Sequence, residues 1–525
     1  MNSLSSDIKV NILLRDNLED IDALNLFKTC KLEYGRIKLY KCKTTIKYKN
    51  LLNYKNCIVT KIKFIQNQQH LNNLPNSITH LQFGGNFNKP VTSHNLPKLI
   101  THLTFGVKFN QNVDNLPNSI THLIFNDNFN KPVDNLPKFI THLTFGFLFN
   151  QRIDNLPNSI IHLTLGYHFN QQANDLPNSV THLRFGESFS QPLDKLPNSV
   201  TSLTFDIKFN LPVNNLPNSI THLTFGYWFN QPLDNLPKSV THLRVSREFN
   251  QAVNKLPNSI TQLDFGNCFN QPVDELPNSV IHLTFDCDFN QPVDKLPNSI
   301  THLSFGYSFN QPVDNLPNSI THLSFGCSFN QRVDNLPNSI THLSFGLLFN
   351  QPVDKLPNSI TYLTFSHCFN HVVNKLPNSV TNLEFGLLFN QAIDDLPNSV
   401  THLTLGGEFN QTVDNLPNSV TYLQFFTHFN QTVDNLPKSI THLVFGDWFN
   451  QPVDKLPNCI THLTFGEEFD QPVNNLPNSI THLTFCHSFN HPIDNLPNSI
   501  THVILGDCFN QPVNHLSKSI TITQL

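Results

Sequence analysis

A strict 20-residue period constrains this chain more than any other feature of its sequence. From Leu96 to Leu516 one unit recurs at that spacing without a slip, and residues 309–328 read Phe-Asn-Gln-Pro-Val-Asp-Asn-Leu-Pro-Asn-Ser-Ile-Thr-His-Leu-Ser-Phe-Gly-Cys-Ser. A unit this short cannot bury its own apolar face, so neighbouring copies must cover one another. The period therefore predicts a solenoid, in which each unit forms one rung and contacts the rungs beside it.

The apolar positions of the unit hold steady through 21 full copies. Ile or Val fills the column of Ile100, Leu fills the column from Leu103 to Leu483, and Phe fills every position in the column of Phe109. Leu103 and Phe105 are two residues apart, which is the spacing of a strand with one buried face. Each unit also carries one or two prolines, which exclude a helix. The predicted fold is a β-rich solenoid of about 23 rungs whose short strands stack into a parallel sheet.

Two polar columns are nearly as regular. Asn fills 19 of the 21 positions in the column of Asn110, and we expect its amide to point inward and to bond backbone groups of its own and the next rung. His fills 16 of the 21 positions in the column of His102, on the face opposite Leu103, so imidazole rings should stack about 4.8 Å apart. This row is uniform and has no partner column of carboxylates, which favours a structural ladder over metal chelation.

Composition excludes several classes of function. The chain has 525 residues with 33 Lys and Arg, 38 Asp and Glu and a net charge of -5, and no basic stripe follows the repeats, so we expect no nucleic-acid partner. No apolar run approaches the length of a membrane helix, and we expect no membrane association. The ten cysteines are irregularly spaced and fit neither a disulfide framework nor a zinc site. Free thiols and the absence of a signal-peptide core predict a cytoplasmic protein.

Catalytic chemistry finds little support in the sequence. Asp recurs at position 114 and at its equivalents in most rungs, which is too often for a catalytic acid. No lone Ser, His or Cys stands in a recognisable nucleophile setting. We therefore expect no enzyme activity, no catalytic residues, no metal and no cofactor.

The repeat resembles a known family. Phe-Asn-Gln-Pro-Val followed by Leu-Pro-Asn-Ser-Ile-Thr-His-Leu-Thr-Phe-Gly is similar to the FNIP repeat, and the resemblance covers residues 71–525. FNIP repeats are relatives of leucine-rich repeats, usually 22 residues long, and are abundant in social amoebae and in giant viruses that infect amoebae. Most units here are two residues shorter. The resemblance implies a leucine-rich-repeat-like solenoid with Leu-x-Phe on the strand, and a host-cytoplasmic location if the protein is viral.

The N-terminal region differs from the repeats. We divide it into a helical region at residues 1–45 and a degenerate first rung at residues 46–70, where Val59-x-x-Ile62-x-Phe64 matches the repeat. Four apolar residues at three-residue steps predict an amphipathic helix, and they are Leu18, Ile21, Leu24 and Phe27. The helix either caps the solenoid or belongs to an F-box, which the run from Asp7 to Leu14 resembles. An F-box would imply that these four residues dock on the linker subunit of a ubiquitin ligase.

Positions 107 and 108 and their equivalents vary most between rungs, while the residue types in the neighbouring columns stay nearly constant. They follow the strand, so we expect their side chains to project into solvent along one edge of the sheet. Exposed Trp and Tyr are the types most enriched in binding hot spots. The predicted partner-binding residues in or beside these columns are Tyr167, Tyr227, Trp228, Arg247, Tyr307 and Trp448. We interpret the chain as a non-enzymatic protein-interaction scaffold. The alternatives are neutral drift at these positions and a structural repeat protein without a specific partner.

Overall fold

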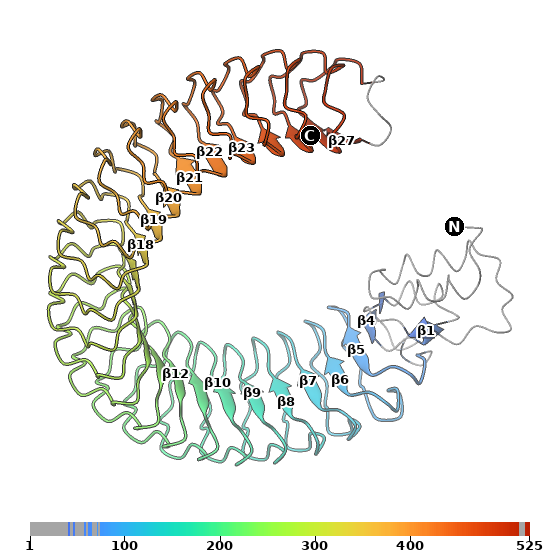
Figure 1. The fold of residues 1–525 in the computed structure, drawn as a ribbon. Helices are drawn as coiled ribbons and strands as arrows, with labels where there is room; N and C mark the ends of the chain where they lie inside the picture. The colour runs from blue at the N-terminus through green and yellow to red at the C-terminus, as the bar shows by residue number, and fades with distance from the viewer. Residues whose placement is uncertain are drawn as a thin grey trace, which may run out of the picture. The chain divides into compact units, whose positions relative to one another are not determined.

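The computed structural model describes residues 40–41, 46–47, 57–58, 61–65, 71, 74–513 and 520–524. The chain divides into two compact units, residues Met1–Ser246 and Arg247–Leu525. Each unit is a stack of rungs whose strands pair in parallel, as Figure 1 shows.

Unit 1 contains the first thirteen described strands. Their bounds are β1 (Tyr40–Lys41), β2 (Ile46–Lys47), β3 (Cys57–Ile58), β4 (Lys61–Ile65), β5 (His80–Phe83), β6 (His102–Thr104), β7 (His122–Ile124), β8 (His142–Thr144), β9 (His162–Thr164), β10 (His182–Arg184), β11 (Ser202–Thr204), β12 (His222–Thr224) and β13 (His242–Arg244). β1 pairs with β3 and β2 pairs with β4. From β4 to β12, each strand pairs with the one that follows it, so the ladder ends at β13 within this unit. The register places Leu183 opposite Leu203, so equivalent residues lie side by side.

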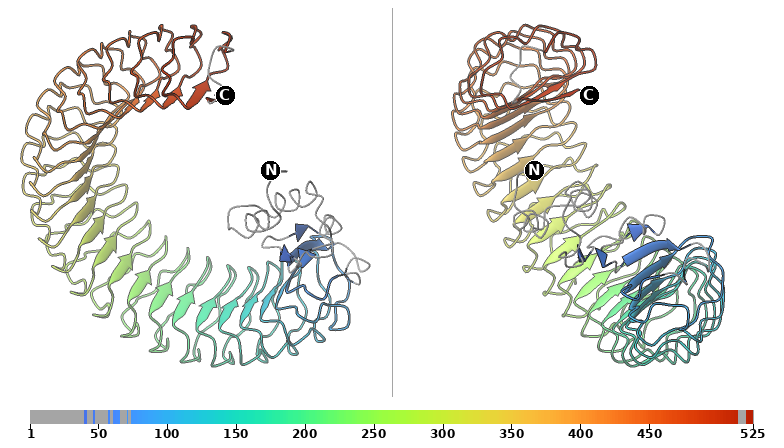
Figure 2. Two further views of the ribbon diagram at one scale, coloured as in Figure 1. Left: turned by 45° about the vertical axis from the view of Figure 1, so that its right-hand side comes forward. Right: turned by 90° about the vertical axis from the view of Figure 1, so that its right-hand side faces the viewer.

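Unit 2 repeats the arrangement. Its strands are β14 (Gln262–Asp264), β15 (His282–Thr284), β16 (His302–Ser304), β17 (His322–Ser324), β18 (His342–Ser344), β19 (Tyr362–Thr364), β20 (Asn382–Glu384), β21 (His402–Leu405), β22 (Tyr422–Phe425), β23 (His442–Val444), β24 (His462–Thr464), β25 (His482–Thr484), β26 (His502–Leu505) and β27 (Thr521–Gln524). Within each unit the strands line one side of the stack and the loops return along the other (Figure 2). We call the strand side the strand face.

The core of each rung consists of the apolar columns. Leu103 and Phe105 are both buried, at 1% and 0% exposure, as their spacing predicted. The Phe105 ring stacks on Phe109 of its own rung with centroids 3.8 Å apart and on Phe125 of the next rung at 5.3 Å. The column of Phe109 adds a ring in every rung and forms a continuous stack, whereas the column of Phe105 is interrupted by Leu165 and Val245 in unit 1 and by Leu405 and Leu505 in unit 2. These rings hold neighbouring rungs together.

Hydrogen bonds to backbone carbonyls fix the return loops. The Ile160 N–H donates to the Pro157 carbonyl at 3.2 Å, which closes the turn after the Leu-Pro pair. The Ser159 hydroxyl donates to the Ile140 carbonyl of the preceding rung at 2.6 Å, and the same bond recurs at Ser179. The Leu-Pro-Asn-Ser-Ile segment of the repeat therefore encodes a bend that also ties each rung to its neighbour.

The prediction of a parallel, leucine-rich-repeat-like solenoid is confirmed. β4 to β27 supply one strand per rung, 24 among the described residues against about 23 expected. Ile62 on β4 lies opposite Leu81 in the Leu column and is 1% exposed. The predicted helix of residues 1–45 lies outside the described residues. In the described part of the chain, no helix is both long enough and apolar enough to cross a membrane.

Candidate functional site

The two turn positions after each strand form what we call the variable rim, which comprises residues 107 and 108 and their equivalents. The backbone of this turn is nearly constant. The Asn128 N–H donates to the Val107 carbonyl of the preceding rung at 2.9 Å, and the Leu148 N–H donates to Asp127 in the same way at 2.7 Å. A Cβ added at Gly106 would lie 2.0 Å from the Gly84 carbonyl oxygen, so this rung requires Gly, although Asn126 stands at the same position in the next rung. The turn is fixed by backbone contacts, and its side chains are free to vary.

In unit 1 the rim carries three of the predicted binding residues. Trp228 is 50% exposed and lies beside Tyr227, with ring centroids 4.9 Å apart. Tyr167 is half-buried and donates its hydroxyl hydrogen to Glu187 of the next rung at 2.6 Å. That hydrogen bond is the main reason that the pKa of the Tyr167 hydroxyl is raised. Tyr167 and Trp228 lie three rungs apart, which is roughly 14 Å at strand spacing, so they do not form one patch.

In unit 2 the rim carries the other three. Tyr307 and Trp448 are 58% and 55% exposed, and Arg247 is exposed as well. Trp448 packs edge-on against His428 of the preceding rung, with centroids 4.1 Å apart. Seven rungs separate Tyr307 from Trp448. The predicted residues are thus presented along the rim of their own unit rather than gathered at one point.

Sequence reasoning missed a rim cluster in unit 1. Phe147 is 43% exposed and stacks on Tyr167 with centroids 4.3 Å apart, and His168 meets the Phe147 ring edge-on at 4.7 Å. The signal was present in the sequence, because Phe147 and Tyr167 occupy the same rim column in consecutive rungs. Reading the columns for aromatic neighbours would have found this patch.

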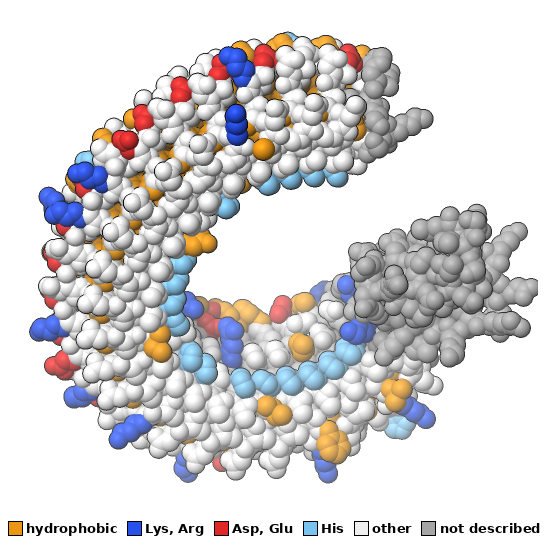
Figure 3. All heavy atoms as spheres, viewed as in Figure 1, with side chains coloured by type: hydrophobic (Ala, Val, Ile, Leu, Met, Phe, Trp, Pro, Cys, Tyr) orange, Lys and Arg blue, Asp and Glu red, His pale blue; other side chains and the backbone are white. Residues whose placement is uncertain are grey.

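The strand face carries the His column as a stacked ladder (Figure 3). In unit 1 the centroids of His102 and His122 lie 4.0 Å apart, and in unit 2 those of His302 and His322 lie 4.2 Å apart. The predicted stacking is confirmed. Thr301 Oγ1 lies 2.8 Å from His302 Nδ1, and equivalent contacts hold most other rings, except His162 and His282, which follow Ile instead of Thr.

Burial lowers the pKa of His302 and His322 below the ordinary value, and the imidazoles of neighbouring rungs lower it further. The stack therefore favours neutral rings. In unit 2 a shallow furrow of about 420 Å³ follows the ladder from His282 to Tyr362, and Ser304 and its equivalents also line it.

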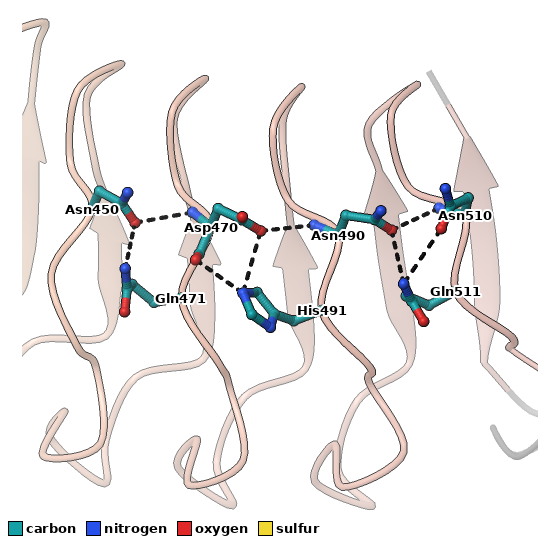
Figure 4. Close-up of polar contacts among 7 residues, drawn as sticks. All are labelled: Asn450, Asp470, Gln471, Asn490, His491, Asn510 and Gln511. Carbon is teal, nitrogen blue, oxygen red and sulfur yellow. Dashed lines mark hydrogen bonds and ion pairs between the residues drawn. The ribbon is translucent and has the colours of Figure 1, made fainter.

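The Asn column forms the expected ladder of bonds to the backbone of the next rung, but its side chains lie at the surface and not inside. The Asn490 Oδ1 accepts the backbone N–H of Asn510 at 3.0 Å and the side-chain amide of Gln511 at 3.3 Å (Figure 4). The Asn side chains are half-buried or exposed, because the buried Phe before each Asn already fills the interior. The Gln that follows Asn in most rungs is the partner that sequence reasoning missed.

The predicted ligase-docking residues Leu18, Ile21, Leu24 and Phe27 lie outside the described residues, so the structure does not place them.

Short parallel strands, a buried Leu column and returning loops define each unit as a leucine-rich-repeat-like solenoid, a class typical of protein-interaction scaffolds. The profile of the family described as FNIP Repeat matches the chain in consecutive, partly overlapping segments from residue 67 to residue 518. The chain belongs to the FNIP repeat family.

Among solved structures, the chain is similar to CroV588, described as a novel circular LRR protein, with 45% identity and a TM-score of 0.80 over 90% of this chain and 82% of that one. YopM from Yersinia enterocolitica matches at 18% identity and a TM-score of 0.41 over 78% of this chain and 88% of that one. An internalin, InlF, from Listeria monocytogenes matches at 14% identity and a TM-score of 0.34 over 62% and 89%. No curated protein sequence matches the chain significantly.

Proposed function

We propose that the chain is a non-enzymatic scaffold for protein–protein interaction whose variable rim selects the partner. One contrast carries this proposal. The turn backbone is bonded from rung to rung in the same way, whereas its side chains differ in nearly every rung and include exposed tryptophans at 228 and 448. Large exposed aromatic side chains on a rigid backbone can be buried by a partner at a low cost in entropy.

The two tryptophans provide the test. Trp228→Ala and Trp448→Ala remove exposed rings, so neither should lower thermal stability. If the rim binds the partner, each should weaken its capture about 30-fold, because truncating a hot-spot residue costs about 2 kcal/mol. The chain offers matched controls away from the rim. Phe139 is 64% exposed on the return loops and Tyr362 is 46% exposed on the strand face, and Phe139→Ser and Tyr362→His install the usual residue of each column.

The capture experiment compares proteins retained from a cell lysate by wild type, by each tryptophan variant and by the two controls. If the two controls retain a partner that the tryptophan variants lose, the result supports partner binding at the variable rim. Equal capture by all five proteins contradicts it, and a wild type that retains nothing specific supports the alternative of a structural repeat protein without a partner.

A finer proposal is that residues 1–45 act as an F-box and make the chain a substrate receptor of a cullin-type ubiquitin ligase. Its support is the resemblance of the N-terminal sequence together with the three-residue spacing of its apolar side chains. Deleting residues 1–45 should abolish pull-down of the ligase's linker subunit and leave the rungs folded. If wild type captures no linker subunit, the region acts as a cap.

We also propose that the protein resides in the cytoplasm, which is the host cytoplasm if the protein is viral. The irregularly spaced cysteines support this location. A fluorescent fusion found in the secretory pathway would contradict it.

A further inference from the structure

Three side chains that can bind metals meet at the rim of the last rungs of unit 2. His487 and Asp507 occupy the same rim column in consecutive rungs, and Cys508 follows Asp507. Their ligand atoms all lie within 4.8 Å of one another, and all three residues are exposed. Among the described residues, no other three His, Cys, Asp or Glu side chains meet in this way.

The distances give each side chain a different role. Cys508 Sγ lies 3.4 Å from His487 Nε2 and 3.9 Å from His487 Nδ1, so the sulfur lies beside the ring. A zinc-type ion has a metal–sulfur bond of about 2.3 Å and a metal–nitrogen bond of about 2.0 Å, so its binding by both atoms requires a rotation of the exposed His487 or Cys508 side chain. Asp507 Oδ1 lies 2.6 Å from His487 Nδ1, the other ring nitrogen. A carboxylate in that place accepts the Nδ1 hydrogen, fixes the tautomer and leaves the Nε2 lone pair available to the metal.

The surrounding charge favours a cation. Asp447, Glu467 and Glu468 occupy the rim of the two preceding rungs and are exposed. Between residues 447 and 513 the chain has one Lys or Arg, Lys455, which pairs with Asp434 at 2.7 Å. Carboxylates without compensating basic residues attract a divalent ion to this end of the rim.

The same charges exclude a second interpretation. Asp507, His487 and Cys508 also have the order of contacts of a catalytic Asp-His-Cys group. A reactive thiolate requires electropositive surroundings, however, and this rim supplies negative charge. A metal ion provides the positive charge that the thiolate needs.

We propose that His487 and Cys508 bind a borderline-soft divalent cation of the zinc type, with Asp507 orienting the imidazole. On binding, the Cys508 thiol loses its proton to solvent and a metal–sulfur bond forms. Thiolate and imidazole favour zinc-type ions over Ca²⁺ or Mg²⁺, which prefer oxygen ligands. Water completes the coordination, because two protein ligands on an exposed surface leave the remaining positions open.

Titration of the reduced, metal-free full chain with Co²⁺ tests this site. Co²⁺ replaces Zn²⁺ at such sites, and a cobalt–thiolate bond absorbs in the near ultraviolet. Wild type should bind one Co²⁺ per chain with this absorption, and Zn²⁺ but not Ca²⁺ should remove it. Cys508→Ser should abolish the band and His487→Gln should weaken binding strongly. Asp507→Asn should weaken binding about 10- to 100-fold, the usual effect of losing an outer-shell partner.

The matched control is Cys459→Ser, because Cys459 is also an exposed free thiol of unit 2. It should bind Co²⁺ as wild type does. A band that persists in Cys508→Ser would assign the binding to another cysteine and overturn the proposal. Absence of saturable binding in wild type, or equal displacement by Ca²⁺, would also overturn it. Melting curves of the variants verify that these surface substitutions leave the fold intact.

Discussion

The carboxylate of Asp470 takes the place of the ladder amide and holds His491 beside it. Its Oδ1 accepts the backbone N–H of Asn490 at 3.1 Å, as an Asn in that column would. His491 Nε2 lies 3.4 Å from the same oxygen and 3.0 Å from the Asp470 carbonyl oxygen (Figure 4). In the rung before, Gln471 and Asn450 make the equivalent contact at 3.0 Å. In these two consecutive rungs, a carboxylate and an imidazole therefore replace the Asn and Gln amides of other rungs. The hydrogen bond to the backbone N–H of the next rung is retained.

This exchange predicts weak coupling between the two side chains. Both are partly exposed, so the pair should contribute about 0.2–1 kcal/mol, as surface ion pairs do. We expect the double variant Asp470→Asn/His491→Gln to match wild type in stability, because it restores the amide pair of other rungs. A double-mutant cycle by chemical denaturation measures the coupling. A coupling above about 2 kcal/mol would show that the pair does more than replace an amide contact.

The sequence predicted the core because apolar columns report burial directly. Leu103, Phe105 and Phe109 recur without polar substitution, and strand periodicity indicated which of them share a face. The direction of the Asn column could not be predicted in the same way. Asn110 follows a buried Phe at a turn, where alternation no longer applies, and its bonds to the next rung form as well at the surface as inside.

Phe309 tests the contribution of the Phe stack. Its ring is 0% exposed and lies 3.7 Å from Phe305 and 6.1 Å from Phe329, measured between centroids. Phe309→Ala should cost about 3–5 kcal/mol, because the neighbouring rungs cannot close on the cavity without breaking their own stacking. Hydrogen exchange should show lost protection in the rungs around residue 309. Tyr307→Ala, two residues away on the rim, should change stability by less than about 0.5 kcal/mol. Equal effects of the two variants would contradict the proposed core.

The variable rim could be predicted from the sequence, whereas the proposed metal site could not. Variability between rungs located the rim, because a constant backbone with changing side chains leaves a column pattern. His487 and Cys508 are 21 residues apart and form no sequence motif, so the spacing of cysteines along the chain indicated no site. The solenoid places residues about 20 apart side by side, and only a comparison of adjacent rungs brings these two together.

Cys459 tests the bend of the return loop. Ser439 and Ser479 donate their hydroxyl hydrogens to carbonyls of the preceding rung at 2.6 Å, whereas Cys459 stands in that column with a weak thiol donor. Cys459→Ser should supply a donor to the Ile440 carbonyl and stabilise unit 2 by about 0.5–1.5 kcal/mol. Chemical denaturation measures the gain. Ser479→Cys should cost a similar amount, and a destabilising Cys459→Ser would refute the role of this hydroxyl.

The His ladder makes stability depend on pH. An unfolded imidazole binds a proton near pH 6.5, whereas burial and neighbouring imidazoles lower the pKa of His302 and His322 in the fold. The unfolded chain therefore takes up protons first on acidification, so stability that is fully present above about pH 6.5 is lost as the pH falls from that value through the lower pKa of the folded imidazoles. We expect a lower melting temperature at about pH 5.5 than at about pH 7.5. His302→Gln/His322→Gln should reduce this difference, and Tyr362→His, which extends the stack, should enlarge it. If wild type and both variants show the same decrease in melting temperature, the stacked imidazoles do not cause the pH dependence.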